Sequence, residues 1–190
     1  MFPICAIIDW NRGLIRLIKD CEIKPLSVLD EAGISYIRLE HERADTMELC
    51  ADIGKEYGAK HCKNLFLTNR NGSVFYLLMM DAEKPFRTSI VSKSLGSTRL
   101  SFGSDEKLRE ILGLEPGSVS VMGLVNDCAR KAFKDGKLKI AIDSELFSRE
   151  LILVHPNTNT ASLVLKTSDI KKLLLHLGID FITVDIQNTL

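Results

Sequence analysis

The chain of 190 residues carries 25 basic and 25 acidic side chains, so its formal net charge is zero. No whole-molecule field draws it onto a polyanion, and any contact with nucleic acid must therefore be local. Hydrophobic residues make up 45% and charged residues 26% of the sequence, which excludes a disordered chain and is typical of one folded domain.

Residues 1–24 are the least typical segment, and we interpret them as an N-terminal extension. Its apolar run from Leu14 to Ile18 is unsuited to solvent, so we expect the extension to pack on the core. Pro25 suits the first turn of a helix that Gly33 ends, and residues 34–40 alternate like a strand.

Thr46 is a favoured N-cap residue, and the spacing after it predicts a helix that ends at Gly58. Residues 63–68 and 74–80 then read as two strands. They flank Asn71-Gly72, a pair that tolerates the backbone angles of a tight turn. We therefore expect a β-hairpin here.

Ser104 predicts a capped helix, since acidic residues fill the first turn and Gly113 supplies the stop. Strands are expected over 119–124, 138–142, 151–154 and 161–165, followed by a helix from Ser168 to Gly178. Helices and strands mix without a repeated βαβ period. This predicts an α+β fold over residues 25–190, a single domain with a mixed, largely antiparallel β-sheet flanked by helices.

The five cysteines form neither a CxxC pair nor a matched metal spacing. They indicate reduced thiols in a cytosolic protein. Residues 1–8 lack the features of a signal peptide, and no apolar run reaches membrane-spanning length. The sequence thus predicts a cytoplasmic protein without a membrane contact.

Polar side chains at the ends of two apolar runs are the strongest candidates for chemistry. Lys63 begins a predicted strand, where its ammonium either reaches solvent or pairs with a phosphate or a developing negative charge. Asn64 points to the opposite strand face and is either structural or part of the site. His155 ends another strand before Pro156, where an imidazole either closes a turn or positions a ligand. The two strand ends can meet at one pocket.

Two further segments are weaker candidates. The turn containing Gly117 and Ser118 presents backbone amides that suit a carbonyl oxygen or carboxylate. Asn159 either forms a loop or joins the site with His155. Glu40-His41 reads more readily as a surface pair than as part of the mouth. The basic run over 130–139 reads as a solvated turn, with a local nucleic-acid contact as the alternative.

No Ser/His/Asp order, nucleophile elbow or carboxylate pair stands out, so a hydrolase of this sequence is expected to lack a conventional nucleophile. At the candidate residues the chain resembles the YbaK/ProX family of trans-editing proteins, relatives of the editing domain of bacterial prolyl-tRNA synthetases. The resemblance runs from about residue 29 to 179. Its motifs are Glu40-His41, Thr46, the Lys63–Leu67 run, Arg99 to Phe102, Pro116 to Val119, Gly123-Leu124, and His155-Pro156 with Asn159-Thr160.

The resemblance implies hydrolysis of the ester between alanine and the terminal adenosine of tRNA(Pro), without a cofactor. Lys63 matches the essential lysine that holds the phosphate or ribose end, and His155 matches the histidine of the amino-acid pocket. The remaining substrate-binding residues that it implies are Asn64, Gly117, Ser118, Val119, Asn159 and Thr46. The substrate's own ribose hydroxyl is implied in water activation, and steric exclusion would reject proline.

Other interpretations stay open at this stage. Cys-tRNA(Pro) is the substrate of the YbaK branch, and Val121-Met122 stand where many relatives have Pro-Phe, which leaves the accepted amino acid open. A non-catalytic module that binds tRNA or a synthetase is the alternative from another class. The expected partner is the acceptor end of mischarged tRNA(Pro), and whether prolyl-tRNA synthetase is a second partner is also open.

Overall fold

The computed structural model describes residues 6–9, 14–43 and 53–186. The strands are β1 (Ala6–Asp9), β2 (Leu14–Leu17), β3 (Ile37–Glu40), β4 (Lys60–Thr68), β5 (Phe75–Asp81), β6 (Ser101–Phe102), β7 (Leu138–Asp143), β8 (Leu151–Val154), β9 (Ala161–Lys166) and β10 (Phe181–Val184). The helices are α1 (Asp20–Glu31), α3 (Thr88–Ser94), α4 (Asp105–Leu112), α5 (Asp127–Lys134) and α6 (Thr167–His176), with 3-10 turns η1 (Lys55–Tyr57), η2 (Val121–Val125) and η3 (Ser144–Ser148). None of the helices in these ranges has the length and apolar character needed to cross a membrane.

One mixed sheet of eight strands organises the molecule. Its order is β10-β7-β5-β4-β8-β9-β3, and β6 pairs with β4. The pairs β10–β7, β7–β5 and β4–β8 are parallel, whereas β4–β5, β4–β6, β8–β9 and β3–β9 are antiparallel. The predicted α+β fold with a mixed, largely antiparallel sheet is confirmed.

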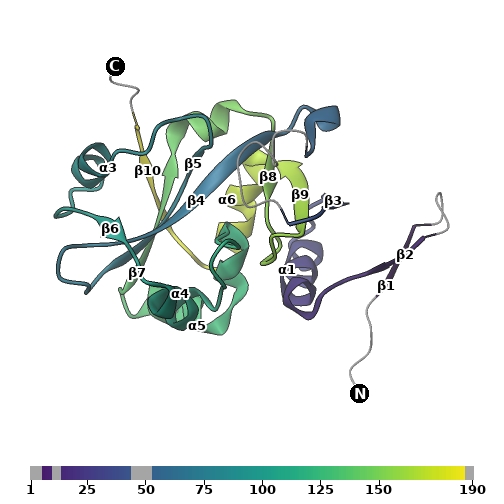
Figure 1. The fold of residues 1–190 in the computed structure, drawn as a ribbon, viewed down its shortest axis with the longest axis horizontal. Helices are drawn as coiled ribbons and strands as arrows, with labels where there is room; N and C mark the ends of the chain where they lie inside the picture. Colours follow the sequence, from purple (N-terminus) through teal and green to yellow (C-terminus); the bar gives the residue numbers. More distant parts are fainter. Residues whose placement is uncertain (1–5, 10–13, 44–52, 187–190) are drawn as a thin grey trace.

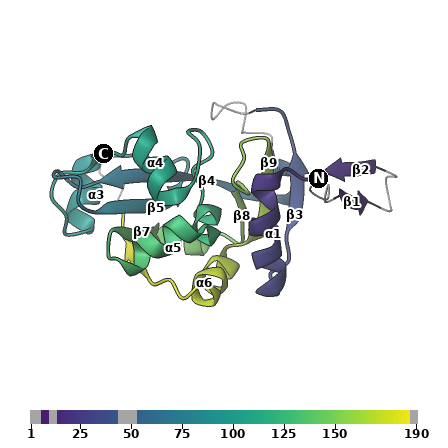
Figure 2. The same ribbon diagram turned by 90° about the horizontal axis from the view of Figure 1, so that it is seen from below.

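The central strand β5 separates two cores, because successive strand residues point to opposite faces. Leu77 and Met79 belong to a large core that also takes residues from α1, α4, α5 and α6. Leu78 and Met80 belong to a smaller core closed by α3. All residues of β5 are buried, so this strand is covered on both faces. Figures 1 and 2 show α1 against the β8–β9–β3 end of the sheet, far from α3.

The local signals in the sequence predicted several elements correctly. β4 and β5 form the expected hairpin, where Gly72 has a φ of 69° and the Asn69 carboxamide accepts from the Ser73 and Val74 amides. Ser104 caps α4 by accepting from the Lys107 amide at 3.2 Å. These elements formed as predicted because residues within a few positions decide them.

The first helix starts earlier than predicted. α1 begins at Asp20 and holds Pro25 inside, so it crosses the boundary placed after residue 24. Its first turns are fixed by Glu22, which is fully buried and accepts from the Arg38 guanidinium of β3 at 2.7 and 3.0 Å. The helix therefore continues through Pro25, although proline removes one helical hydrogen bond.

One strand prediction was wrong. Residues 119–124 do not form a strand; η2 occupies 121–125, and all five of its residues are buried. A short buried apolar run has no periodicity that separates a strand from a helical turn. The basic run over 130–139 was predicted in part: residues 135–137 form a turn that leads into β7, but residues 130–134 belong to α5. β4 also starts at Lys60, so Lys63 lies inside it.

The N-terminal extension contains a hairpin of β1 and β2, paired from Ala6↔Leu17 to Asp9↔Leu14. Figure 1 shows it at the end of the molecule beside α1. That the extension packs on the core stays a prediction. Thr46 and most of the helix predicted after it lie outside the described residues, which resume at Ile53.

Candidate active site

Lys63 points to the face of the sheet that carries the smaller core and pairs across β4–β5 with Met80. Its Nζ donates to the carbonyl of Ala82 at 3.3 Å and also to the carbonyl of Lys84. Burial lowers the pKa of Lys63, while the negative charge of Asp81 opposes this shift. An ammonium has three donors, so two carbonyl acceptors leave a third for a ligand.

His155 follows β8 directly, and the parallel register places it level with Lys63. β8 pairs with β4 at Lys60↔Ile152 and His61↔Leu153, so the same offset matches Lys63 with His155. Lys63, inside β4, and His155, after β8, therefore lie at the same level of two adjacent strands; that they share one pocket stays a prediction.

The proton of the His155 imidazole is assigned by its partner. Nδ1 lies 3.1 Å from the Ala161 carbonyl, which only accepts, so Nδ1 carries the hydrogen and Nε2 keeps a lone pair. Burial lowers the pKa of His155, and the nearby His41 and His61 add to the shift. The ring is therefore neutral at pH 7, suited to hydrogen bonding rather than to a fixed positive charge.

His41 belongs to the same cluster, although the sequence favoured a surface pair. Its ring centroid lies 6.3 Å from that of His155, and its Nε2 lies 3.0 Å from the Ser162 hydroxyl. The pairing Glu40↔Ala161 brings the end of β3 to the start of β9, which no local signal reveals. His61 lies in β4, with its Nε2 3.0 Å from the Ile53 carbonyl.

Asn64 and Cys62 point to the opposite face of β4, as the alternation predicted. The Cys62 thiol donates to the Leu153 carbonyl at 3.0 Å, and burial raises its pKa to about 12. The Asn64 amide nitrogen lies 3.9 Å from Cys62 Sγ, while its Oδ1 is buried without a partner in the described residues. An unpaired buried acceptor costs about 1–3 kcal/mol, so this oxygen favours a ligand donor.

The turn around Gly117 and the loop around Asn159 meet at one cavity of about 450 Å³. Gly117 has a φ of 86°, which a residue with a side chain rarely adopts. Ser118 donates its hydroxyl to the Glu115 carbonyl at 2.7 Å, so this group stabilises the turn. The lining residues are Cys21, Arg43, Gly113, Leu114, Glu115, Pro116, Ser118, Asn126, Asn157, Thr158 and Asn159.

Lys63 and His155 do not line that cavity. A second cavity of about 420 Å³ shares His61 and Ala82 with their cluster, and Lys55, Lys60 and Glu83 complete its polar rim. Val119 lies in neither cavity and packs against the large core instead. Val121 and Met122 are buried in that core as well. Thr46 lies outside the described residues.

The basic helix α5 offers little free charge. The Lys131 ammonium lies 2.6 Å from Asp135, and Arg130 forms an ion pair with Asp127. Pairing within the helix is the usual state of a solvated charged face. These pairs favour a solvated face for Arg130 and Lys131, and a local nucleic-acid contact of the rest of the run stays a hypothesis.

Comparison with known proteins identifies the family of this chain. The model of a family described as the aminoacyl-tRNA editing domain matches residues 41–173. The chain is 31% identical over 167 residues to the prolyl-tRNA editing protein ProX of Acetoanaerobium sticklandii, covering 88% of this chain and 98% of that protein. It is 25% identical over 163 residues to the prolyl-tRNA synthetase associated domain-containing protein 1 of Xenopus laevis, covering 84% and 93%.

A solved structure of a candidate trans-editing enzyme for prolyl tRNA synthetase superposes with a TM-score of 0.65 at 17% identity. The match covers 90% of this chain and 99% of that one. At this identity the superposition shows the fold alone. The described strands and helices thus form an arrangement already seen in a solved protein.

Proposed function

Because the chain belongs to the aminoacyl-tRNA editing domain family, we propose that it is a trans-editing deacylase that hydrolyses the ester of mischarged tRNA(Pro). Ala-tRNA(Pro) is the substrate that we assign first. The observation that supports the proposal is the parallel register of β4 and β8, which puts Lys63 and His155 level on adjacent strands. This register would bring a cation and a neutral imidazole to the same substrate.

The reaction needs a water molecule and a leaving ribose oxygen. Water oxygen attacks the aminoacyl carbonyl carbon, the bond from that carbon to the ribose oxygen breaks, and the proton from water ends on the released ribose hydroxyl. The products are the free amino acid and uncharged tRNA. The substrate's second ribose hydroxyl is the group that we assign to water activation, since Cys62 is protonated at pH 7.

Each polar group then has a role that its geometry supports. The third donor of Lys63 binds the phosphate or ribose of the terminal adenosine, as charge-assisted hydrogen bonds are among the strongest available. His155 uses Nε2 to accept from the aminoacyl group, while Nδ1 stays on the Ala161 carbonyl. Asn64 offers its unpaired Oδ1 to a ligand donor. Gly117, Ser118, Val119, Asn159 and Thr46 complete the substrate-binding set that we propose.

Size and charge set the choice of substrate. A pocket closed around a methyl group has no space for the pyrrolidine ring, and steric rejection can exceed the roughly 1–3 kcal/mol available from one methylene. With no net charge, the protein neutralises few phosphates, so it contacts the acceptor end rather than the whole tRNA. Prolyl-tRNA synthetase, which makes the mischarged substrate, is the protein partner that this function implies, in the cytoplasm.

The test is hydrolysis of Ala-, Cys-, Ser- and Pro-tRNA(Pro) by the purified protein, by Lys63→Ala and by Lys107→Ala as a matched control. Lys107 lies on α4 in an exposed ion pair with Glu110. We expect release of alanine by the wild type and the control, and none by Lys63→Ala. Release of cysteine alone would assign the Cys-tRNA(Pro) activity instead. Binding of tRNA without any hydrolysis would overturn the enzyme in favour of a binding module.

A further inference from the structure

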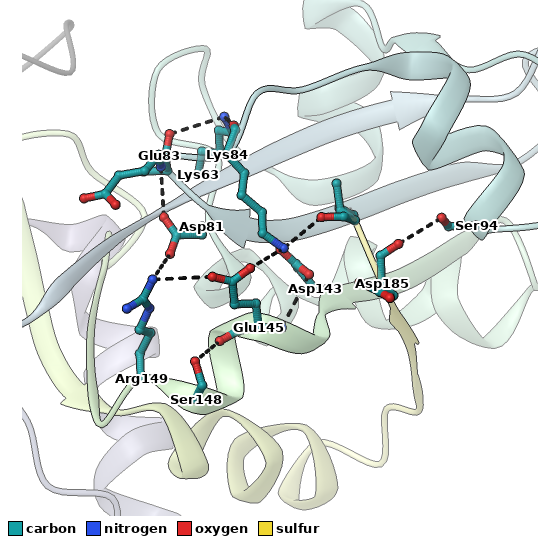
Figure 3. A network of polar contacts seen from close by, with 12 residues as sticks. Lys63, Asp81, Glu83, Lys84, Ser94, Asp143, Glu145, Ser148, Arg149 and Asp185 are labelled. Atoms are coloured by element: carbon teal, nitrogen blue, oxygen red, sulfur yellow. Dashed lines mark hydrogen bonds and ion pairs between the residues drawn. The ribbon is translucent and has the colours of Figure 1, made fainter. Parts of the chain in front are cut away.

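The two carbonyls that hold Lys63 belong to one short turn after β5. Lys63 Nζ donates to Ala82 and Lys84, which stand one residue apart on either side of Glu83. The position of the ammonium therefore depends on the position of this turn. What fixes the turn is a group of charged side chains behind it, drawn in Figure 3.

Asp81 fixes the start of the turn. Its Oδ1 accepts from the Glu83 amide at 2.9 Å, and its Oδ2 accepts from Arg149 Nη2 at 3.1 Å. The same Arg149 nitrogen lies 3.5 Å from Glu145 Oε1. Figure 3 shows Asp81, Glu145 and Arg149 pointing toward one another. The turn is thereby tied to η3, which follows β7.

Lys84 fixes the end of the turn. Its side chain is buried, and its Nζ lies 2.7 Å from both Asp143 Oδ2 and Glu145 Oε2. The same ammonium donates to the Ile186 carbonyl at 2.9 Å. Burial opposes the charged form, but the hydrogen bonds and charges of Asp143 and Glu145 raise the pKa of Lys84. The Lys84 ammonium stays charged and contacts β7, η3 and the segment after β10.

Stability alone gives little reason for such a network. Apolar side chains of similar size often replace buried ion pairs with no loss, because desolvation offsets the attraction. A set of fixed charges does restrict the backbone that carries them. Here that backbone is the turn that supplies both acceptors of Lys63.

We propose that Asp81, Lys84, Glu145 and Arg149 are positioning residues, which hold the 82–84 turn so that its carbonyls aim the Lys63 ammonium at the substrate. The proposal rests on the deacylase function above. None of the four touches the substrate. They act through Lys63. The two acidic and two basic side chains of this group have no net charge, and Asp143 beside Lys84 adds one negative charge. Lys63 therefore keeps its own charge for the ligand.

The test compares Arg149→Met with Arg149→Lys and with Lys107→Met as a control. Arg149 is one-third exposed, so its loss leaves a smaller defect than loss of Lys84. One nitrogen of Arg149 makes both contacts, so a lysine ammonium can replace it. Glu145→Gln is the second variant, which weakens the network from a more exposed position.

Two readouts separate positioning from mere folding. The first is kcat/KM for deacylation, which we expect to fall about ten- to a hundredfold in Arg149→Met, as expected for a displaced catalytic group. Arg149→Lys should restore most of it, and Lys107→Met should leave it unchanged. The second is competitive acetylation of native protein with acetic anhydride, where mass spectrometry compares Lys63 with exposed Lys131. We expect Lys63 to react severalfold faster in Arg149→Met and Glu145→Gln.

Unchanged acetylation of Lys63 in both variants would overturn the proposal, as would a loss of activity that Arg149→Lys does not restore. Acetylation needs no substrate. If the wild type hydrolyses no mischarged tRNA(Pro), the deacylase function fails, while the acetylation ratio still decides whether the network positions Lys63.

Discussion

Cys62 lies in β4 between His61 and Lys63, close to the level of His155 on the adjacent strand. A thiol nucleophile paired with a histidine would be a natural hypothesis at this place. We predict instead that Cys62 is chemically inert and that the deacylase works without it. Its thiol points away from Lys63, to the other face of β4, and donates to the Leu153 carbonyl at 3.0 Å. A thiolate there would face a carbonyl oxygen in a desolvated position.

The magnitude follows from the pKa. Burial raises the pKa of Cys62 from 9.0 to about 12. At pH 8 the thiolate fraction falls from about 10⁻¹ to about 10⁻⁴, which slows reaction about 10³-fold by ionisation. A more basic thiolate is also more nucleophilic, which recovers about a factor of 20. The net expectation is a reaction about 50-fold slower than that of the same thiol in the unfolded chain.

Alkylation with iodoacetamide at pH 8, followed by mass spectrometry of the peptide containing Cys62, measures this ratio in native and urea-unfolded protein. Exposed Cys21 is the internal control and should react in both. Cys62→Ser should still hydrolyse the substrate, since removal of a true nucleophile costs on the order of 10⁴-fold or more. Native labelling of Cys62 within about fivefold of the unfolded rate, or an inactive Cys62→Ser protein that folds normally, would refute the reasoning.

Three further predictions concern stability, pH and the unpaired amide. Glu22→Gln should lower the free energy of unfolding by about 3–5 kcal/mol in urea titrations, because it removes the buried negative charge that faces Arg38, while the Glu40 carboxylate 3.7 Å from Arg38 is exposed; Lys107→Met, in an exposed pair, should change it by less than about 1 kcal/mol. Because burial lowers the pKa of His155 from 6.5, the unfolded chain binds its proton more readily than the native state. The free energy of unfolding should therefore fall as the pH drops below 6.5. The rate of deacylation should stay constant down to that pH and decline below it. His155→Gln should remove this part of the pH dependence of stability, and an unchanged dependence would contradict the assignment. Asn64→Leu should leave the melting temperature unchanged or raise it, since it removes an unpaired buried acceptor, yet kcat/KM should fall. A variant with a lower melting temperature and unchanged activity would assign Asn64 a structural role alone.

The parts of the fold that the sequence predicted are those that nearby residues decide. Ser104 caps a helix because its hydroxyl reaches an amide three positions away, and Asn71-Gly72 turns a hairpin because both residues accept the required backbone angles. Residues with tertiary partners were predicted less well. α1 starts at Asp20 because Glu22 binds Arg38 of β3, and residue spacing within the helix does not predict this contact.

The candidate site divides in the same way. The polar ends at Lys63 and His155 were visible, because ionisable residues at the end of apolar runs are conspicuous. Their exact neighbours were not, since the parallel pairing of β4 with β8 joins distant segments. His41 was taken for a surface residue for this reason. Non-local strand order, rather than residue type, decides its place.

The charge of Lys63 is the feature that best connects this fold with an anionic substrate. Lys84 and Arg149 lie beside carboxylates, whereas in the described residues Lys63 has carbonyl oxygens as its acceptors and no carboxylate at ion-pair distance. Carbonyl dipoles orient an ammonium without neutralising it, so its full charge remains for a phosphate or a developing oxyanion. Burial lowers the pKa of Lys63, but Asp81 opposes that shift from behind the turn. Asp81 therefore has a second effect beyond geometry: its charge favours the protonated form of Lys63, although the carboxylate itself is bound to Arg149 and the Glu83 amide.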